Sequence, residues 1–409
     1  MTLLLALFLP STSPAQSPPW LRLSAHGIAA YTWADPTPGG GSLGEVRLVQ
    51  PSVMAHGGAL SNRLRMVTTV NLEGLTISEG ELTPGAWGEG FVDRRHPHTY
   101  LHEVVVSLHD ALGHLDGNTH VSLSAGKGFA PFGTDDPMSR PALRYPVNHH
   151  LAQILERWVA IAGLRAGPLV LEGALFNGDE PERPGQWPRM ARFGDSWSGR
   201  LTVAPSRGLE LQGSYADVHS PEHRPGAGPD QAKWSVSGRW VGQVKGFPIY
   251  GLAEWARTSE ADGFFVFNSF LAEGAWTAGR SRLHYRFERT ERPEEERVTP
   301  FRSRRPHLEN SIVGTTRWTI HTLGYAFQAL TGGNSAWVEP FVELSHGRVR
   351  DVGGGVFDVR GFYGKTSFWS VSTGLRVDLG MRMHRMGRYG VAQDTAAGSA
   401  REQHGDNGH

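Results

Sequence analysis

The chain of 409 residues contains no cysteine, which excludes disulfide scaffolds, cysteine-ligated metal sites and thiol nucleophiles. It also lacks any apolar run of about 18 residues, the length that a transmembrane helix needs. Its 40 basic residues balance its 40 acidic residues, so no net positive charge attracts nucleic acid. We therefore expect no nucleic-acid partner, and any membrane-spanning segment has to be a strand.

Aromatic residues are abundant in a chain that is polar on average. There are 13 Trp, 18 Phe and 9 Tyr residues at a mean hydropathy of −0.34. Transmembrane β-barrels combine these properties, because a polar lumen lowers the mean hydropathy while aromatic girdles mark both membrane interfaces. A barrel also accommodates this length as one domain, where soluble folds of this length divide into two or three.

The first 17 residues read MTLLLALFLPSTSPAQS. The apolar run at residues 3–9 is too short to span a bilayer and long enough for the core of a signal peptide. Small residues at Ser13 and Ala15 fit a signal-peptidase site, so we expect a signal peptide at residues 1–15. The alternative is a buried amino-terminal segment.

Apolar and polar residues alternate in segments of about ten residues, which is typical of strands with one wet face. Trp197, Leu201 and Val203 alternate with polar residues, and residues 369–379 repeat the pattern most clearly. Sixteen such segments are expected, at 20–33, 46–57, 60–72, 98–110, 118–127, 151–165, 167–177, 194–205, 207–218, 231–242, 247–258, 265–277, 281–290, 310–326, 334–348 and 366–381. The pattern predicts an all-β fold, a transmembrane antiparallel up-and-down β-barrel of about 16 strands, with 14 to 18 as the range.

The connections between these segments differ in length. Residues 205–208 form a tight turn, whereas residues 218–230, 290–309 and 349–365 are long, polar and rich in Gly or Pro. Short periplasmic turns and long external loops characterise outer-membrane barrels. We expect a barrel domain at residues 16–381 and a disordered tail at residues 382–409.

The segment GKGFAPFGTDDPMSRP at residues 126–141 resembles a motif of the phosphate-selective porin O and P family and related porin-like proteins. The matching residues are Gly126, Lys127, Phe129, Pro131, Phe132 and Gly133. A second similarity is the Phe176-Asn177-Gly178 end of a later strand. Gly and Pro at these points let the chain leave the wall and enter a loop, including one that folds into the lumen.

The resemblance implies an outer-membrane channel for general diffusion or for anions, in a Gram-negative-type bacterium. The chain departs from the family in two respects. It has few lysines and uses arginines in their place, and it continues past its last expected strand to a polar tail that ends at His409.

Basic residues on the polar parity of the strands are candidates for lining the pore. They are Arg63, Arg65, Arg200, Lys233, Arg239, Arg282, Arg286, Arg317 and Arg376. Acidic residues on the same parity are Glu103, Glu210, Glu288, Glu339, Glu343 and Asp378. Two interpretations stay open: a net positive wall that favours anions, or ion-paired residues that keep the pore solvated.

A histidine-rich stretch around residues 94–103 is the most metal-like part of the sequence, since imidazole binds zinc and copper readily. Its weak candidate ligands are His96, His98 and His102. Alternate residues of a strand lie roughly 6.5–7 Å apart, too far for His98 and His102 to chelate one ion, so we expect no metal site. His149 and His150 are further candidate ligands.

The sequence shows no sign of an enzyme active site. His102-Glu103 begins like the HExxH zinc-protease motif, but the second histidine is missing. We therefore expect no enzyme and no cofactor. The predicted function is an outer-membrane porin for passive diffusion of small hydrophilic solutes, with some preference for anions, as a monomer or homotrimer in outer-membrane lipid. The alternatives are an outer-membrane enzyme with a site at the rim, a plugged structural or adhesive barrel, and a soluble secreted all-β protein.

Overall fold

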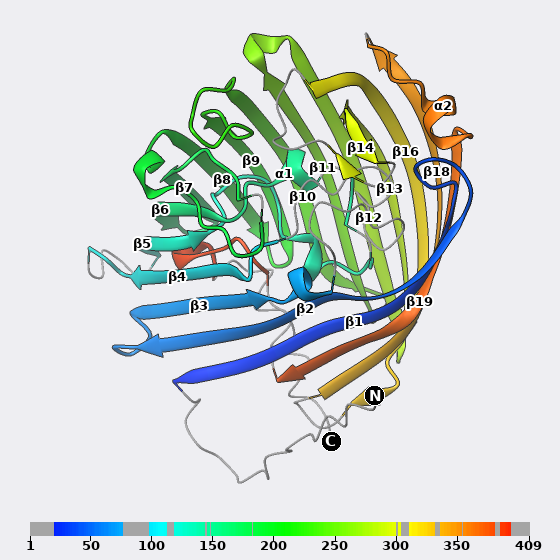
Figure 1. Ribbon diagram of the computed structural model, residues 1–409. Helices are drawn as coiled ribbons and strands as arrows, with labels where there is room; N and C mark the ends of the chain where they lie inside the picture. The colour runs from blue at the N-terminus through cyan, green and yellow to red at the C-terminus, as the bar shows by residue number, and fades with distance from the viewer. Residues whose placement is uncertain are drawn as a thin grey trace.

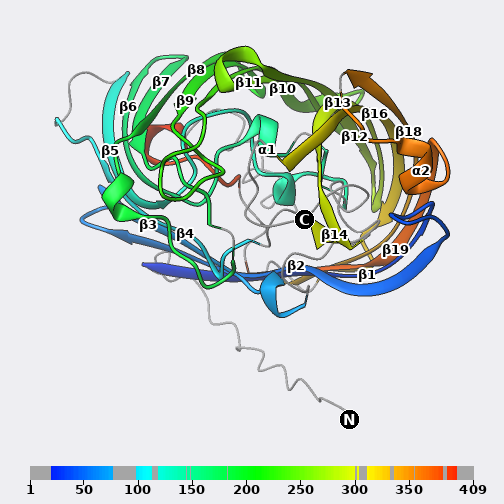
Figure 2. The ribbon, with the colours of Figure 1, turned by 45° about the horizontal axis from the view of Figure 1, so that its top comes forward.

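A computed structural model of the chain describes residues 20–76, 98–112, 118–143, 145–147, 149–181, 183–299, 302–303, 311–331, 336–353, 355–380 and 385–393. It is a closed antiparallel β-barrel (Figures 1 and 2). The described residues form a sheet of seventeen strands, in which the two-residue β17 (Leu330–Thr331) pairs with β18 and the other sixteen form the wall. Pairing between β1 and β19 closes the ring. The prediction of sixteen strands is therefore confirmed.

Each wall strand pairs with its neighbours along the chain. The wall strands are β1 (Leu21–Asp35), β2 (Leu43–Ala59), β3 (Leu64–Asn71), β4 (Leu101–His109), β5 (Thr119–Gly128), β6 (Arg157–Ala166), β7 (Leu169–Phe176), β8 (Ser196–Ser206), β9 (Leu209–Val218), β10 (Gln231–Val244), β11 (Phe247–Glu260), β12 (Phe265–Ala278), β13 (Ser281–Glu295), β16 (Ile312–Phe327), β18 (Ala336–Gly353) and β19 (Ser367–Gly380). A separate two-stranded sheet joins β14 (Arg297–Thr299) to β15 (Arg302–Ser303).

Three predicted strands begin at least three residues too early. The segment expected at residues 60–72 starts in the turn before β3, which begins at Leu64. The segment expected at residues 151–165 starts inside the helix α1 (His149–Ala152), and β6 begins only at Arg157. The segment expected at 98–110 reaches the sheet at Leu101, so His98 lies outside the strand. His98 and Thr99, like Ile154 and Leu155, are buried although they lie outside the wall strands.

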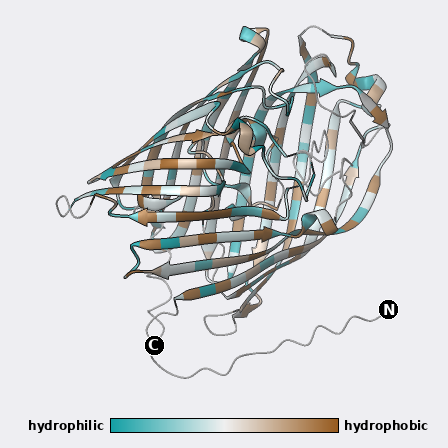
Figure 3. Cartoon of the chain, turned by 60° about the vertical axis from the view of Figure 1, so that its left-hand side comes forward, coloured by the Kyte–Doolittle hydropathy of each residue, from teal (hydrophilic) through white to brown (hydrophobic). Residues whose placement is uncertain are grey.

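Alternate residues of the wall face two different environments. Along β8, Trp197 and Leu201 are 48% and 44% exposed, whereas Arg200 and Thr202 are 2% and 0% exposed. Figure 3 shows hydrophobic and hydrophilic residues alternating along the strands. An apolar outer face and a polar inner face are the expected pattern of a barrel that is surrounded by lipid. Among the described residues, no helix is both long and apolar enough to cross a bilayer.

The two ends of the barrel differ in their connections. Short turns such as Arg207-Gly208 and Lys245-Gly246 join strands at one end, where β1 begins and β19 ends. The long connections lie at the other end; one of them contains the helix α2 (Val359–Tyr363). We call these the turn end and the loop end.

The expectation of a disordered tail is wrong for residues 385–393. This segment includes a turn of 3-10 helix, η7 (Gly390–Ala392), and it lies inside the barrel (Figure 2, red). Met386, Tyr389 and Val391 are all buried. Long-range contacts order this segment, which precedes the polar end of the chain. The predicted signal peptide at residues 1–15 lies outside the described residues.

Candidate functional site

The residues of the family-like motif turn the chain from the wall into the lumen. Gly126, in β5, has φ 149°, and a Cβ atom there would lie 2.0 Å from the carbonyl oxygen of Val104. After Gly128 the strand ends, and Phe129 and Phe132 are buried in the interior. We call residues 129–156 the inward loop, and its described residues lie within the ring of strands (Figure 2).

Gly133 fixes the path of the inward loop. Its φ is 66°, and an added Cβ atom would lie 1.7 Å from the carbonyl oxygen of Ala152, on the returning part of the loop. Its N–H donates a hydrogen bond to Ser214 Oγ of β9 at 2.9 Å. Only glycine combines this backbone conformation with so close an approach.

The inward loop crosses the lumen to the opposite wall. The N–H groups of Leu143 and Val147 donate to Glu343 Oε1 at 2.5 Å and to Glu288 Oε2 at 2.7 Å. Arg376 donates to the carbonyl oxygen of Pro141 at 3.1 Å, and Lys233 donates to that of His150 at 2.8 Å. Wall charges therefore bind the backbone of this loop and hold it across the lumen.

Asp135 links the inward loop to the wall and to the carboxy-terminal segment. Its carboxylate lies 3.3 Å from Arg239 Nε, 2.7 Å from Arg385 Nε and 3.5 Å from Arg388 Nε. Burial alone would raise the pKa of Asp135, but the guanidinium groups of Arg385 and Arg239 outweigh it and hold that pKa well below its usual range. Asp135 is thus a structural anion that braces the inward loop.

The carboxy-terminal segment, residues 385–393, fills the other side of the lumen. Arg385 binds Glu210 of β9 through two hydrogen bonds of 2.8 and 2.7 Å. Tyr389 donates to Glu103 Oε2 at 2.7 Å and accepts from the N–H of Phe129 at 3.2 Å. The N–H of Val391 donates to Ser122 Oγ at 2.9 Å. The segment thus contacts both the wall and the root of the inward loop.

Most of the predicted pore-lining residues face the interior. On the inner parity lie Arg65, Arg200, Lys233, Arg239, Arg282, Arg286 and Arg376. Arg200 forms a double hydrogen bond with Glu172 at 2.7 and 2.8 Å, and Arg286 lies 2.7 Å from Glu273. The interpretation as ion-paired wall residues fits these contacts.

Two predicted pore-lining residues are misplaced. Arg63 lies in the exposed turn between β2 and β3, where it donates to the carbonyl oxygen of Asp110 at 3.1 Å. Arg317 lies on the outer parity of β16 and pairs with Glu291 of β13. Glu291 also accepts from Asn268, so a polar cluster on the outer face satisfies Arg317 without the lumen.

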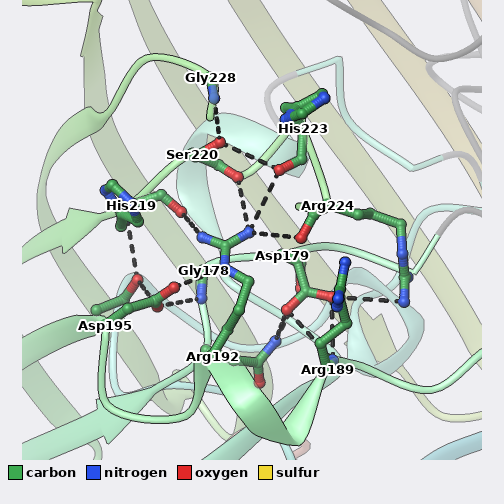
Figure 4. Close-up of polar contacts among 12 residues, drawn as sticks. Gly178, Asp179, Arg189, Arg192, Asp195, His219, Ser220, His223, Arg224 and Gly228 are labelled. Carbon is green, nitrogen blue, oxygen red and sulfur yellow. Dashed lines mark hydrogen bonds and ion pairs between the residues drawn. The ribbon is translucent and has the colours of Figure 1, made fainter. Parts of the chain in front are cut away.

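Arg192 ties together two loops at the loop end, residues 177–195 and 219–230. Its Nε donates to Asp195 at 2.7 Å, and its terminal nitrogens donate to the carbonyl oxygens of His219 and Ser220 (Figure 4). Gly178 donates to Asp195 Oδ1 at 2.7 Å. These loops therefore form one connected rim, and the Asn-Gly similarity marks the start of it.

The histidine candidates come together in a way that strand spacing does not predict. His96 lies outside the described residues. The rings of His98 and His102 are 4.7 Å apart, centroid to centroid, because His98 precedes the strand and folds back. The argument that excluded joint chelation by His98 and His102 is therefore wrong. Glu156, which the sequence did not single out, completes a group of three possible ligands.

Comparisons with known proteins support the fold. Neither a protein-family model nor a curated protein sequence matches the chain, so the resemblance to the O and P family stays a prediction. An anion-selective porin from Comamonas acidovorans is similar in structure, with a TM-score of 0.52 and 12% identity over 88% of this chain and 99% of that chain. OmpF of Salmonella typhi, in complex with daunomycin, has a TM-score of 0.51 and 9% identity over 88% and 97%. At such identities the likeness shows the fold alone: the chain has the barrel fold of these porins.

Proposed function

We propose that the chain is a porin of the outer membrane of a Gram-negative-type bacterium, through which small hydrophilic solutes diffuse passively. The observation that supports this most is the closed wall with an apolar outer face and a charged inner face. A closed barrel satisfies all its backbone hydrogen bonds within the wall, so it can lie in lipid without an exposed edge.

The outer surface supports insertion into a bilayer. Trp255, Trp276, Tyr285 and Tyr325 are between 38% and 45% exposed on the outer parity of their strands. Trp and Tyr are enriched where a membrane meets water. A soluble protein rarely exposes so many large apolar side chains on one continuous surface.

The interior supports only a modest preference for anions. Arg200, Arg286 and Arg239 each lie within 3.3 Å of a carboxylate oxygen. A paired arginine contributes little net potential, because the adjacent carboxylate cancels most of its field. The selectivity that we propose is therefore weaker than a wall of nine unpaired cations would produce.

A second candidate function is a plugged structural or adhesive barrel. The specific observation that favours it is the filling of the lumen by the inward loop and the carboxy-terminal segment. Inward-facing residues far apart in the wall, such as Thr32, Thr202, Glu254 and Ser345, are each at most 2% exposed. The plugged barrel predicts a folded protein that does not conduct.

Conductance of single molecules in a planar bilayer separates these candidates. Full-length protein, refolded in detergent and checked by its heat-modifiable mobility, is compared with a chain truncated after Gly380. A chain truncated after Gln393 is the matched control, because it keeps every described contact of residues 385–393. The porin proposal expects stepwise conductance from the full-length chain, and a larger step after truncation at Gly380.

Each of the other conductance results points to a different state of the lumen. If only the chain truncated after Gly380 conducts, the carboxy-terminal segment is a plug and the native barrel is closed. If all three folded proteins are silent, the porin proposal is wrong. Equal conductance of all three would show that residues 385–393 leave the conducting path open.

A further inference from the structure

Histidine side chains gather around Glu156 where the inward loop returns to the wall. His98 Nδ1 lies 3.9 Å and His102 Nδ1 lies 2.8 Å from Glu156 Oε1. His149, at the end of the loop, has its ring 5.7 Å from that of His98. All four residues are buried, at 7% exposure or less.

The backbone is irregular at the points that bring these side chains together. The pairing of β3 with β4 shifts at His102, so that Thr69 faces Glu103 while Val70 faces Leu101. This bulge turns His102 inward, although Val106 and Leu108, on its parity, are exposed outside. Bulges often redirect a side chain beside a functional site.

Glu156 itself has φ 60°, a left-handed conformation that non-glycine residues seldom adopt. Its carboxylate accepts hydrogen bonds of 2.8 Å from the N–H and the hydroxyl of Thr99. These bonds fix the carboxylate between the two histidines. The ligand positions are therefore set by the backbone before any ion arrives.

We propose that His98, His102 and Glu156 bind a divalent transition-metal ion, with zinc as the best match, at the root of the inward loop. The three ligand atoms lie within 4.8 Å of one another. Two imidazoles and one carboxylate are a common zinc ligand set, with bonds of about 2.0–2.2 Å. This inference does not depend on the proposed channel.

A free ring nitrogen and a free carboxylate oxygen are independent signs of a ligand site. Among the described residues, His102 Nε2 and Asp136 Oδ2 have no hydrogen-bond partner, and both residues are fully buried. The carboxylates of Glu156, Asp136 and Glu103 all act electrostatically on His102. A histidine that binds a metal through one ring nitrogen usually donates a hydrogen bond from the other to a carboxylate, a carbonyl oxygen or water. This hydrogen bond makes the histidine a stronger ligand.

The positive charge of Lys127 disfavours a cation at this site. Its ammonium group donates to Thr99 Oγ1 and to the carbonyl oxygen of Leu101, and its charge acts on Glu156. Metal binding also has to displace the proton shared by His102 Nδ1 and Glu156 Oε1. Affinity should therefore fall on acidification, and it should rise when the lysine charge is removed.

The test is metal binding by folded full-length protein in detergent, after treatment with a chelator. Isothermal titration with Zn²⁺ should give one ion per chain, and Co²⁺ should give the visible absorption of a low-coordinate site. Changing a residue that only hydrogen-bonds to a metal ligand lowers metal affinity about 10- to 100-fold. H98A and E156Q each remove a ligand itself, so each should weaken binding by at least this factor. K127M should strengthen it roughly tenfold, because it removes a nearby like charge.

H120A is the matched control, since His120 pairs with Asp110 at 2.9 Å in the turn-end region of the barrel, outside the group. Binding that H98A and E156Q weaken and H120A leaves intact supports the site. Failure of the folded wild-type chain to bind Zn²⁺ or Co²⁺ overturns it, and so does binding that H98A leaves unchanged. H98A covers the case in which E156Q does not fold.

Discussion

Gly133 occupies the tightest point of the inward loop, where two parts of the chain cross. In G133A the new Cβ atom would lie 1.7 Å from the carbonyl oxygen of Ala152, and alanine would also have to hold φ 66°. We expect the loop to shift at a cost of more than about 1–3 kcal/mol, the range for strained backbone alone. Hydrogen exchange measured by mass spectrometry should show faster exchange in residues 129–156.

G173A is the control for this prediction. Gly173 lies in β7, and an added Cβ atom there has no neighbour within 4 Å. Exchange in the inward loop should match that of the wild type. If G133A also matches the wild type, Gly133 does not fix the path of the loop.

Arg192 holds two loops together at the loop end of the barrel. Its side chain is nearly buried and binds Asp195 and several carbonyl oxygens, so R192M removes charged hydrogen bonds and leaves Asp195 with less compensation. We expect local opening of residues 177–195 and 219–230 to become easier by about 2–4 kcal/mol. Limited proteolysis of the folded barrel should then cut these loops faster.

R189M tests whether charge alone matters. Arg189 is exposed in the same loop, and only its backbone N–H contacts Asp179. R189M removes one positive charge, as R192M does, but leaves the hydrogen bonds between the two loops intact. Equal cleavage of both variants would mean that Arg192 does not hold the rim together.

The carboxy-terminal segment should loosen in acid. The pKa of Asp135 is lower in the folded chain than the unfolded value of about 3.9, so Asp135 stabilises the docked segment above that value. This contribution is lost as the pH falls below it, by roughly 1 kcal/mol between pH 7 and pH 3. Because the chain lacks cysteine, a spin label at V391C reports only on this segment, and its mobility should increase at pH 3.

The D135N variant separates this carboxyl from the other acids. Its label should be more mobile than that of the parent at pH 7, since Arg385 loses its ion pair with the Asp135 carboxylate. The mobility of the label should then change less between pH 7 and pH 3 in D135N than in the parent. A parent label that is equally immobile at both pH values would contradict the assignment of Asp135 as the anchor.

Wall strands are predictable from the sequence because lipid and lumen impose opposite demands on alternate residues. The alternation of Trp197 and Leu201 with Arg200 is enough to separate the two faces of β8. The alternating pattern does not predict local irregularities of the strands. The bulge at His102 reverses the expected side, and Arg317 lies outside because Glu291 of the neighbouring strand satisfies it there.

The contents of the lumen depend on contacts between residues that are far apart in the chain. Asp135 and Arg385 are 250 positions apart, and Tyr389 meets Glu103 across 286 positions. Residues 385–393 are predicted as part of the polar tail that follows them, because no local pattern encodes their partners. The inward loop is predictable only in outline, from the glycines and prolines that end β5. The sequence therefore predicts the wall better than the path through it.

Ion selectivity of the whole barrel should depend on which face loses a carboxylate. E172Q leaves Arg200 without its carboxylate on the inner face, whereas E291Q does the same for Arg317 on the outer face. Both variants lose one negative charge, so they are matched in net charge. An unpaired arginine beside the conducting path lowers the barrier for anions, while one on the outer face acts across the wall and is screened by solvent and headgroups.

We therefore expect the reversal potential in a KCl gradient to shift toward that of chloride for E172Q and to stay at the parent value for E291Q. Both folded variants are measured in planar bilayers, in the truncated background if the full-length chain does not conduct. Equal shifts would mean that net charge rather than lumen charge sets selectivity. No shift in E172Q would place Arg200 away from the conducting path.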